Sequence, residues 1–255
     1  MEKSIVVTWD FTEKAKASFQ HALILAKIMK RDIVLFHVIK KDSEKEATNA
    51  KLEAEASELF NAYGLKPKYA CKTGDIYTSI NEFCDEISAP LIVMPLHNSK
   101  RALKVITGST TPFYLVQQAP KFEKITDIIV PIDHYEENRV QLNWVIYLAK
   151  IFSANINIIK PFINSNARNK LMKKNIFFAK QLMNAKKTVY GIRTAKREVK
   201  FSVAINNFTK EIDADLIFMM TYNLKDYMNT VEKESSIPPV LCLNPRSVKI
   251  VPDKY

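Results

Sequence analysis

Short apolar runs alternate along the chain with longer segments in which apolar residues recur at every third or fourth position. Runs of this length, rich in β-branched residues and bounded by polar ones, predict strands that are buried on both faces. They lie at 4–8, 33–39, 68–71, 91–94 and 113–116 in the first half, and at 127–132, 156–160, 199–201, 216–220 and 240–243 in the second. The periodic segments predict helices, the first of them capped by Thr12, at 19–29, 44–63, 77–87, 102–106, 142–152, 166–187 and 203–212.

The alternation of strands and helices determines the expected fold class. Consecutive parallel strands need crossover connections, and these connections are right-handed. We therefore expect an α/β protein in which each half forms an open parallel five-stranded sheet with helices on both faces, as in Rossmann-like folds.

The two halves of the chain are related by an internal repeat. The tetrapeptide Leu-Ala-Lys-Ile at 25–28 recurs at 148–151, and the pair Tyr63-Gly64 recurs as Tyr190-Gly191, in the same order along the chain. The repeat predicts two copies of one domain. We place the first domain, the linker, the degenerate second domain and the tail at 1–118, 119–125, 126–248 and 249–255.

Candidate binding residues follow from the predicted sheets. Ligands of open parallel sheets bind beyond the carboxyl ends of the strands, where the strand order reverses. This rule predicts one crevice per domain, lined in the first by Thr8, Trp9, Asp10, Val38, Leu96 and His97 and in the second by Asp133, Lys160 and Thr221. Two interpretations of the strand-end aspartates stay open: each contacts a ligand, or each caps the turn between strand and helix through local backbone hydrogen bonds.

The composition argues against a glycine-dependent nucleotide site and against known catalytic motifs. The sequence holds four glycines, whereas the usual usage of ~7% would place roughly 18 in a chain of this length. A phosphate-binding loop needs glycines so that its backbone N–H groups can approach the ligand, and neither G-x-G-x-x-G nor a Walker-type motif is present. H-E-x-x-H and G-x-S-x-G are also missing, and the three cysteines lack C-x-x-C spacing. We expect no catalytic residue and no metal site.

The strand-end residues carry a resemblance to a known family. Asp10 closes the motif Val-Thr-Trp-Asp, Asp133 closes Val-Pro-Ile-Asp, and Gly74-Asp75-Ile76 precedes a predicted helix. With these motifs and the order of its elements, the chain resembles the universal stress protein family in its tandem two-domain form. The resemblance implies an adenine nucleotide alpha hydrolase-like fold and a pseudo-dimer of the two domains through their last strands. In the ATP-binding members, the strand-end aspartate contacts the nucleotide and a loop G-x2-G-x9-G-[S/T] holds the phosphates.

That phosphate loop is missing from both domains. Pro95 and Asn98 stand where its first two glycines are expected, and the 17 residues between Met94 and Pro112 are too few for both the loop and the helix after it. Gly108 is therefore interpreted as the end of that helix. The second domain has no glycine after its fourth predicted strand. We expect that ATP binding has been lost.

The positive charge is concentrated in the second half of the chain. Of the net +11, residues 1–123 contribute +2, from 17 basic and 15 acidic residues, and residues 124–255 contribute +9, from 21 and 12. The predicted helix 166–187 has an apolar side that includes Leu171 and Met172, and a basic surface formed by Lys170, Lys173, Lys174, Lys186 and Lys187. Such a helix is either an anion-binding surface or a solvated face over a core.

These observations favour a cytoplasmic, non-catalytic stress-response or signalling factor without a cofactor. We expect it to act on a protein partner or an unidentified small ligand, not on nucleic acid or a membrane, and a homodimer of the pseudo-dimer stays open. One alternative is a sensor that binds ATP or AMP through Asp10 and His97, with Lys100 and Arg101 in place of the glycine loop. The second alternative is an anion-binding surface on helix 166–187.

Overall fold

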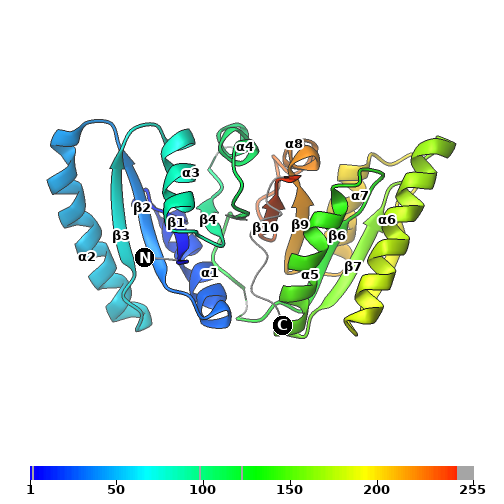
Figure 1. The fold of residues 1–255 in the computed structure, drawn as a ribbon, viewed down its shortest axis with the longest axis horizontal. Coiled ribbons are helices and arrows are strands. Elements are labelled where there is room, and N and C mark those ends of the chain that lie inside the picture. Colours follow the sequence, from blue (N-terminus) through cyan, green and yellow to red (C-terminus); the bar gives the residue numbers. More distant parts are fainter. Residues whose placement is uncertain (2, 98, 122, 246–255) are drawn as a thin grey trace. The chain divides into compact units, whose positions relative to one another are not determined.

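The computed structural model describes residues 1, 3–97, 99–121 and 123–245, and the side chains of all of these except 99–101. Contacts divide the chain into two compact units, Met1–Lys121 and Phe122–Tyr255 (Figure 1). The division falls inside the linker expected at 119–125, whereas the expected tail at 249–255 lies outside the described residues.

The first unit is a parallel five-stranded sheet with the strand order β3-β2-β1-β4-β5. In chain order its elements are β1 (Ile5–Thr8), α1 (Glu13–Met29), β2 (Ile33–Ile39), a short 3-10 helix (Asp42–Glu44), α2 (Lys45–Tyr63), β3 (Lys68–Thr73), α3 (Ile76–Glu86), β4 (Ile92–Pro95), α4 (Ser99–Thr107) and β5 (Phe113–Val116). The strand order reverses between β1 and β4, where Val6 pairs with Ile92 and Val7 with Val93. Right-handed crossovers therefore place α1 and α2 on one face of the sheet and α3 and α4 on the other.

The second unit repeats this architecture, with the strand order β10-β9-β6-β7-β8. Its elements are β6 (Asp127–Pro131), α5 (Asn138–Phe152), β7 (Asn155–Lys160), α6 (Asn166–Ala185), β8 (Tyr190–Thr194), α7 (Phe201–Glu211), β9 (Leu216–Met220), α8 (Thr221–Thr230) and β10 (Val240–Leu243). Its order reverses between β6 and β9, where Ile128 pairs with Leu216 and Ile129 with Ile217. The predicted α/β fold, with five parallel strands and their helices in each unit, is confirmed.

The helix starts show why the sequence folds in this way locally. The Thr12 side chain accepts a hydrogen bond from the Ala15 N–H at 3.3 Å, which satisfies one of the free donors at the start of α1, as predicted. α4 ends directly before Gly108, as predicted, but the φ angle of Gly108 lies outside the left-handed range, so this residue does not form a left-handed cap.

One strand prediction is wrong. The strand expected at 199–201 does not form there: Phe201 begins α7, and the strand that pairs with β7 is β8, Tyr190–Thr194. β8 lies at the edge of the sheet and is mostly exposed, so its sequence shows no continuous apolar run. The two Tyr-Gly pairs are not equivalent positions of the repeat either, because Tyr63 ends α2 whereas Tyr190 begins β8.

Gly74 occupies a position that only glycine fits. Its φ is +148°, and a Cβ atom there would lie 2.7 Å from the Ser79 hydroxyl oxygen. We expect Gly74→Ala to lower the free energy of unfolding by about 1–3 kcal/mol, because the backbone conformation is strained for other residues and the Cβ atom collides with α3. Urea unfolding followed by circular dichroism measures this. Gly191→Ala is the control, since nothing lies within 4 Å of its added Cβ; equal losses in both variants would contradict the prediction.

Candidate functional site

The connections after the fourth strand of each unit are very short. In the first unit β4 ends at Pro95 and α4 begins at Ser99. In the second, β9 ends at Met220 and α8 begins at Thr221, with no residue between them. A loop that wraps a phosphate with backbone N–H groups needs a longer connection at this place, so neither unit has the cradle that glycine-rich nucleotide sites use.

In the first unit, Asp10 lies just after β1, at the point where the strand order reverses. One carboxylate oxygen accepts hydrogen bonds from the Thr12 N–H at 3.2 Å and the Thr12 hydroxyl at 2.6 Å. The other lies 2.7 Å from His97 Nε2, which follows β4. Both oxygens of Asp10 are thus engaged by the protein itself, and the Asp10–His97 contact bridges the ends of the two strands that flank the crevice.

Three residues that the sequence did not single out contact the chain just after β1 and β4. His37 Nδ1 lies 2.6 Å from the Trp9 carbonyl oxygen, and the Phe11 ring lies 5.0 Å from the His37 ring. Phe11 has a φ of 61°, an uncommon conformation for a bulky residue. Lys14, in the first turn of α1, reaches the Leu96 carbonyl oxygen at 3.4 Å. The only signal in the sequence was their proximity to Asp10 and to the end of a strand.

The remaining predicted residues of the first crevice differ in accessibility. Thr8, Val38 and Leu96 are half-buried, whereas Trp9 is only 2% exposed and belongs to the core. Lys100 was predicted to face a ligand phosphate, and its side chain lies outside the described part of the chain.

In the second unit, Asp133 lies in a different environment from its counterpart Asp10. Asp133 is 4% exposed, and its carboxylate accepts three hydrogen bonds. The donors are the Tyr135 N–H at 2.9 Å, the Asn138 side-chain amide at 2.6 Å and the Asn223 side-chain amide at 3.0 Å. Because Asn223 comes from α8 and Asn138 from α5, Asp133 ties the two helices together beyond the ends of β6 and β9.

A polar network surrounds this carboxylate. The Asn175 side-chain amide, from α6, donates to the backbone oxygens of Asp133 at 3.0 Å and of Tyr135 at 2.8 Å. The Tyr222 ring packs 4.8 Å from the Tyr135 ring, and burial together with the negative charge of Asp133 raises the pKa of the Tyr222 hydroxyl. The carboxylate that corresponds to Asp10 is therefore enclosed by the protein's own side chains.

One signal for this network was visible in the sequence. Asn175 falls among Met172, Ile176 and Ala179, which share the buried stripe of α6. A polar side chain on a buried stripe needs a hydrogen-bond partner, and here that partner is the backbone beside Asp133. The sequence did not indicate which partner it would be.

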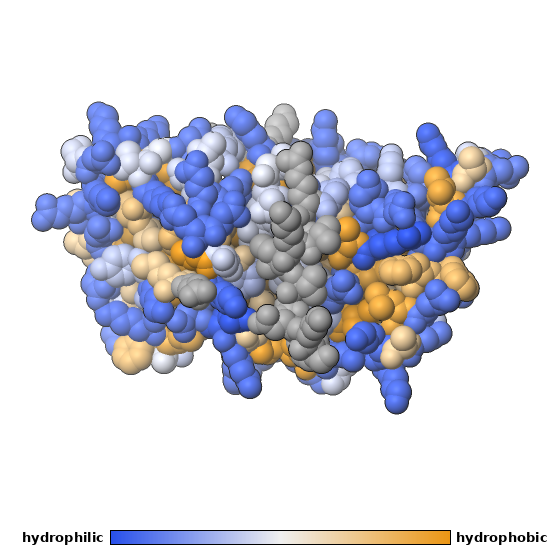
Figure 2. Space-filling model, viewed as in Figure 1, coloured by the Kyte–Doolittle hydropathy of each residue, from blue (hydrophilic) through white to orange (hydrophobic). Residues whose placement is uncertain are grey.

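The other predicted residues of the second unit are half-buried or exposed, and within the described part of the chain no hydrogen bond or ion pair joins them to Asp133. Thr221 is half-buried at the start of α8, and Lys160 lines a hollow beside α6. The five lysines of the predicted basic surface are exposed. Leu171, expected on the apolar side, is 47% exposed because the buried stripe runs through positions 172, 175, 176, 179 and 183. Figure 2 shows apolar surface among hydrophilic side chains on the part of the second unit that holds α6.

Among the described residues, no group of three or more His, Cys, Asp or Glu side chains could hold a metal ion. The described helices are too short or too polar to cross a membrane. The three cysteines are free thiols, and Cys84 and Cys242 are buried.

Known proteins resemble this chain in sequence over its first unit and in fold over most of its length. A model of the universal stress protein family matches residues 1–121. A universal stress protein from Archaeoglobus fulgidus is similar in structure, with a TM-score of 0.74 and 15% identity over 94% of this chain and 96% of that chain. A functionally unknown protein from Pseudomonas aeruginosa has a TM-score of 0.65 and 14% identity over 97% of this chain and 94% of that one. At such identities the likeness concerns the fold alone. No curated protein matches the chain.

Proposed function

We propose that this chain is a non-catalytic stress-response or signalling factor that works without ATP. The premise is that residues 1–121 belong to the universal stress protein family and that the described residues 123–245 repeat its fold. The chain would act through a protein partner or a small ligand other than a nucleotide. The cytoplasmic location, the pseudo-dimer and any further homodimer stay predictions.

The observation that carries this proposal is the state of the two strand-end aspartates. Asp10 is engaged by Thr12 and His97, and Asp133 is buried under three donors. A nucleotide that used either carboxylate would have to break these contacts, and the connections after β4 and β9 offer no loop of backbone donors in compensation. Nucleotide binding would therefore cost free energy to break these contacts, and the backbone hydrogen bonds to phosphate that would compensate for this cost are missing.

The absence of an enzyme activity is supported by the same contacts. A general base must lie within hydrogen-bond distance of a nucleophile or of the substrate. His97 Nε2 contacts the Asp10 carboxylate and His37 Nδ1 contacts the Trp9 carbonyl oxygen, while the neighbouring Thr12 hydroxyl donates to Asp10 and not to a histidine. Neither geometry presents an activated hydroxyl or thiol.

The test is a search for bound and added nucleotide. Freshly purified protein is heat-denatured, and the supernatant is analysed by liquid chromatography with mass detection; ATP and AMP are then titrated into the native protein by calorimetry. We expect no stoichiometric nucleotide and no binding heat at millimolar concentrations. A stoichiometric adenine nucleotide that disappears in Asp10→Ala, but stays in a variant of the exposed Asp42, would overturn the proposal and favour the nucleotide sensor.

A further inference from the structure

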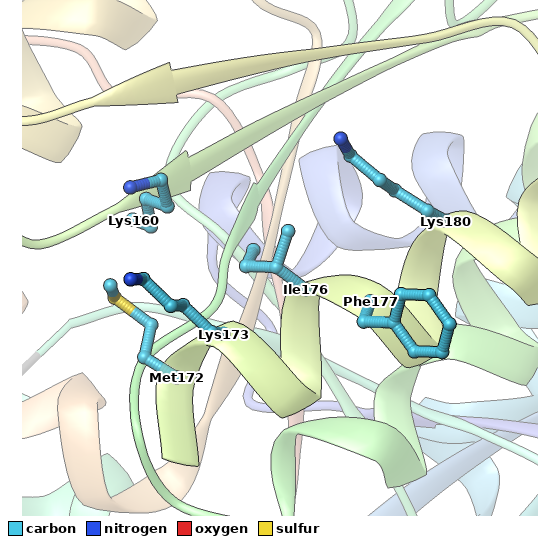
Figure 3. A pocket seen from close by; sticks show the side chains of 6 residues that line it. All are labelled: Lys160, Met172, Lys173, Ile176, Phe177 and Lys180. Atoms are coloured by element: carbon cyan, nitrogen blue, oxygen red, sulfur yellow. The ribbon is translucent and has the colours of Figure 1, made fainter. Parts of the chain in front are cut away.

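A hollow of about 170 Å³ lies between α6 and the carboxyl end of β7 in the second unit (Figure 3). It lies at the edge of the sheet where open parallel sheets bind ligands, beyond the carboxyl ends of the strands, and one strand away from the reversal between β6 and β9. The lining consists of three lysines and three apolar residues: Lys160, Lys173, Lys180, Met172, Ile176 and Phe177.

The charges in the hollow are all of one sign. Lys160 is half-buried at the end of β7, and burial together with the positive charge of Lys173 lowers the pKa of its ammonium group. Within the described residues, no salt bridge joins Lys160, Lys173 or Lys180 to a carboxylate. Figure 3 shows the amino groups of Lys160 and Lys173 pointing in the same direction. An anion bound there would offset both the desolvation and the repulsion.

The apolar residues determine what else the ligand must carry. Met172 and Ile176 are 3% and 9% exposed and form the buried apolar part of the hollow, whereas Phe177 is 61% exposed at its rim. Pockets for drug-sized ligands usually enclose ~300–1,000 Å³, so a hollow of about 170 Å³ fits a smaller molecule than a nucleoside triphosphate. The ligand therefore combines a compact anionic group with one small apolar group.

We propose that this hollow binds a small phosphate monoester, with the phosphate between Lys160 and Lys173 and the apolar group against Ile176 and Phe177. Two ammonium groups that line one hollow, from β7 and from α6, favour a dianion, and a phosphate monoester carries a charge of about −1.5 to −2 at pH 7. This site goes beyond the proposed function, and it shares no residue with the crevice around Asp10, so it can be tested separately from nucleotide binding.

The experiment titrates phenyl phosphate into the full chain by calorimetry at neutral pH and low salt. Inorganic phosphate probes the anionic part alone, and benzoate probes a monoanion with the same ring. We expect phenyl phosphate to bind about tenfold more tightly than either of them, because only phenyl phosphate has both the double charge and the apolar group. Phe177→Ser is expected to lower the affinity for phenyl phosphate and to leave the affinity for inorganic phosphate unchanged.

The lysine variants locate the site. We expect Lys160→Met and Lys173→Gln each to lower the affinity for phenyl phosphate by about tenfold. Methionine at position 160 keeps the apolar stem of the lysine. Lys174→Gln is the matched control, because it removes the same charge from the same helix at an exposed position that does not line the hollow. The proposal is overturned if phenyl phosphate does not bind, if benzoate binds equally tightly, or if Lys174→Gln weakens binding as much as Lys173→Gln does.

Discussion

Replacing Asp133 by alanine is expected to lower the free energy of unfolding of the second unit by about 3 kcal/mol, because the buried donors that surround its carboxylate would lose their acceptor. A buried N–H without a partner costs about 1–3 kcal/mol, and the amides of Asn138 and Asn223 can regain only part of this by turning. The variant also disconnects α5 from α8 beyond the ends of β6 and β9.

Asp10→Ala is the matched control, since Asp10 and Asp133 hold the same position in the repeat. Asp10 is 41% exposed, and water can replace its contacts with Thr12 and His97. We expect a loss of about 0.5–1 kcal/mol, the lower part of the range found for cap residues. Equal losses for the two aspartates would show that Asp133 is not held by the network that we describe.

The two tryptophans allow each unit to be followed separately. The chain has two, Trp9 in the first unit and Trp144 in the second, and both are 2% exposed. Tryptophan fluorescence during urea unfolding reports the second unit in a Trp9→Phe background and the first unit in a Trp144→Phe background. Asp133→Ala should shift the Trp144 transition to lower urea and leave the Trp9 transition less affected.

A second large effect is expected for His21 in acid. His21, on α1, is 7% exposed, and its Nε2 atom lies 3.0 Å from the Gln118 carbonyl oxygen. Burial lowers its pKa to about 4, from an ordinary value near 6.5, although the hydrogen bond to Gln118 acts in the opposite direction. Between these two values the unfolded chain binds a proton that the folded chain does not. The first unit therefore loses stability as the pH falls from 6.5 towards 4, by about 3 kcal/mol in total.

The measurement compares wild type with His21→Gln, whose amide can still donate a hydrogen bond to the Gln118 carbonyl. Urea unfolding at pH 7.5 and pH 5.0, followed by Trp9 fluorescence in the Trp144→Phe background, should show a loss for wild type that exceeds the loss for His21→Gln by about 2 kcal/mol. Carboxylates that titrate in the same range contribute equally to both proteins and cancel. A loss of the same size in both would mean that His21 is protonated in the folded state as readily as in the unfolded chain.

Much of the fold could be predicted from the sequence because its signals are local. A strand that is buried on both faces must be apolar along its buried length, as β9 is throughout and as β1 and β6 are except at one end. A helix over a sheet must repeat its apolar residues at helical spacing, as α1 and α5 do. Where burial is incomplete, the local signal weakens. The edge strand β8 was therefore placed wrongly, and Leu171 of α6 was assigned to the wrong side.

The same distinction between local signals and tertiary contacts applies to the candidate site. The sequence by itself determined that the phosphate loop is missing, since glycines and chain length between two strands are countable without a structure. It also placed Asp10 and Asp133 at strand ends, because strand ends follow from the apolar runs. Their different environments were decided by contacts across long stretches of chain: Asp10 meets His97, and Asp133 meets Asn223, 90 residues away. The hollow at Lys160 likewise needs β7 and α6 packed together. Periodicity specifies which face of an element is buried, but only tertiary packing decides which polar groups meet there, and this decides whether a carboxylate is free to bind or is used by the fold.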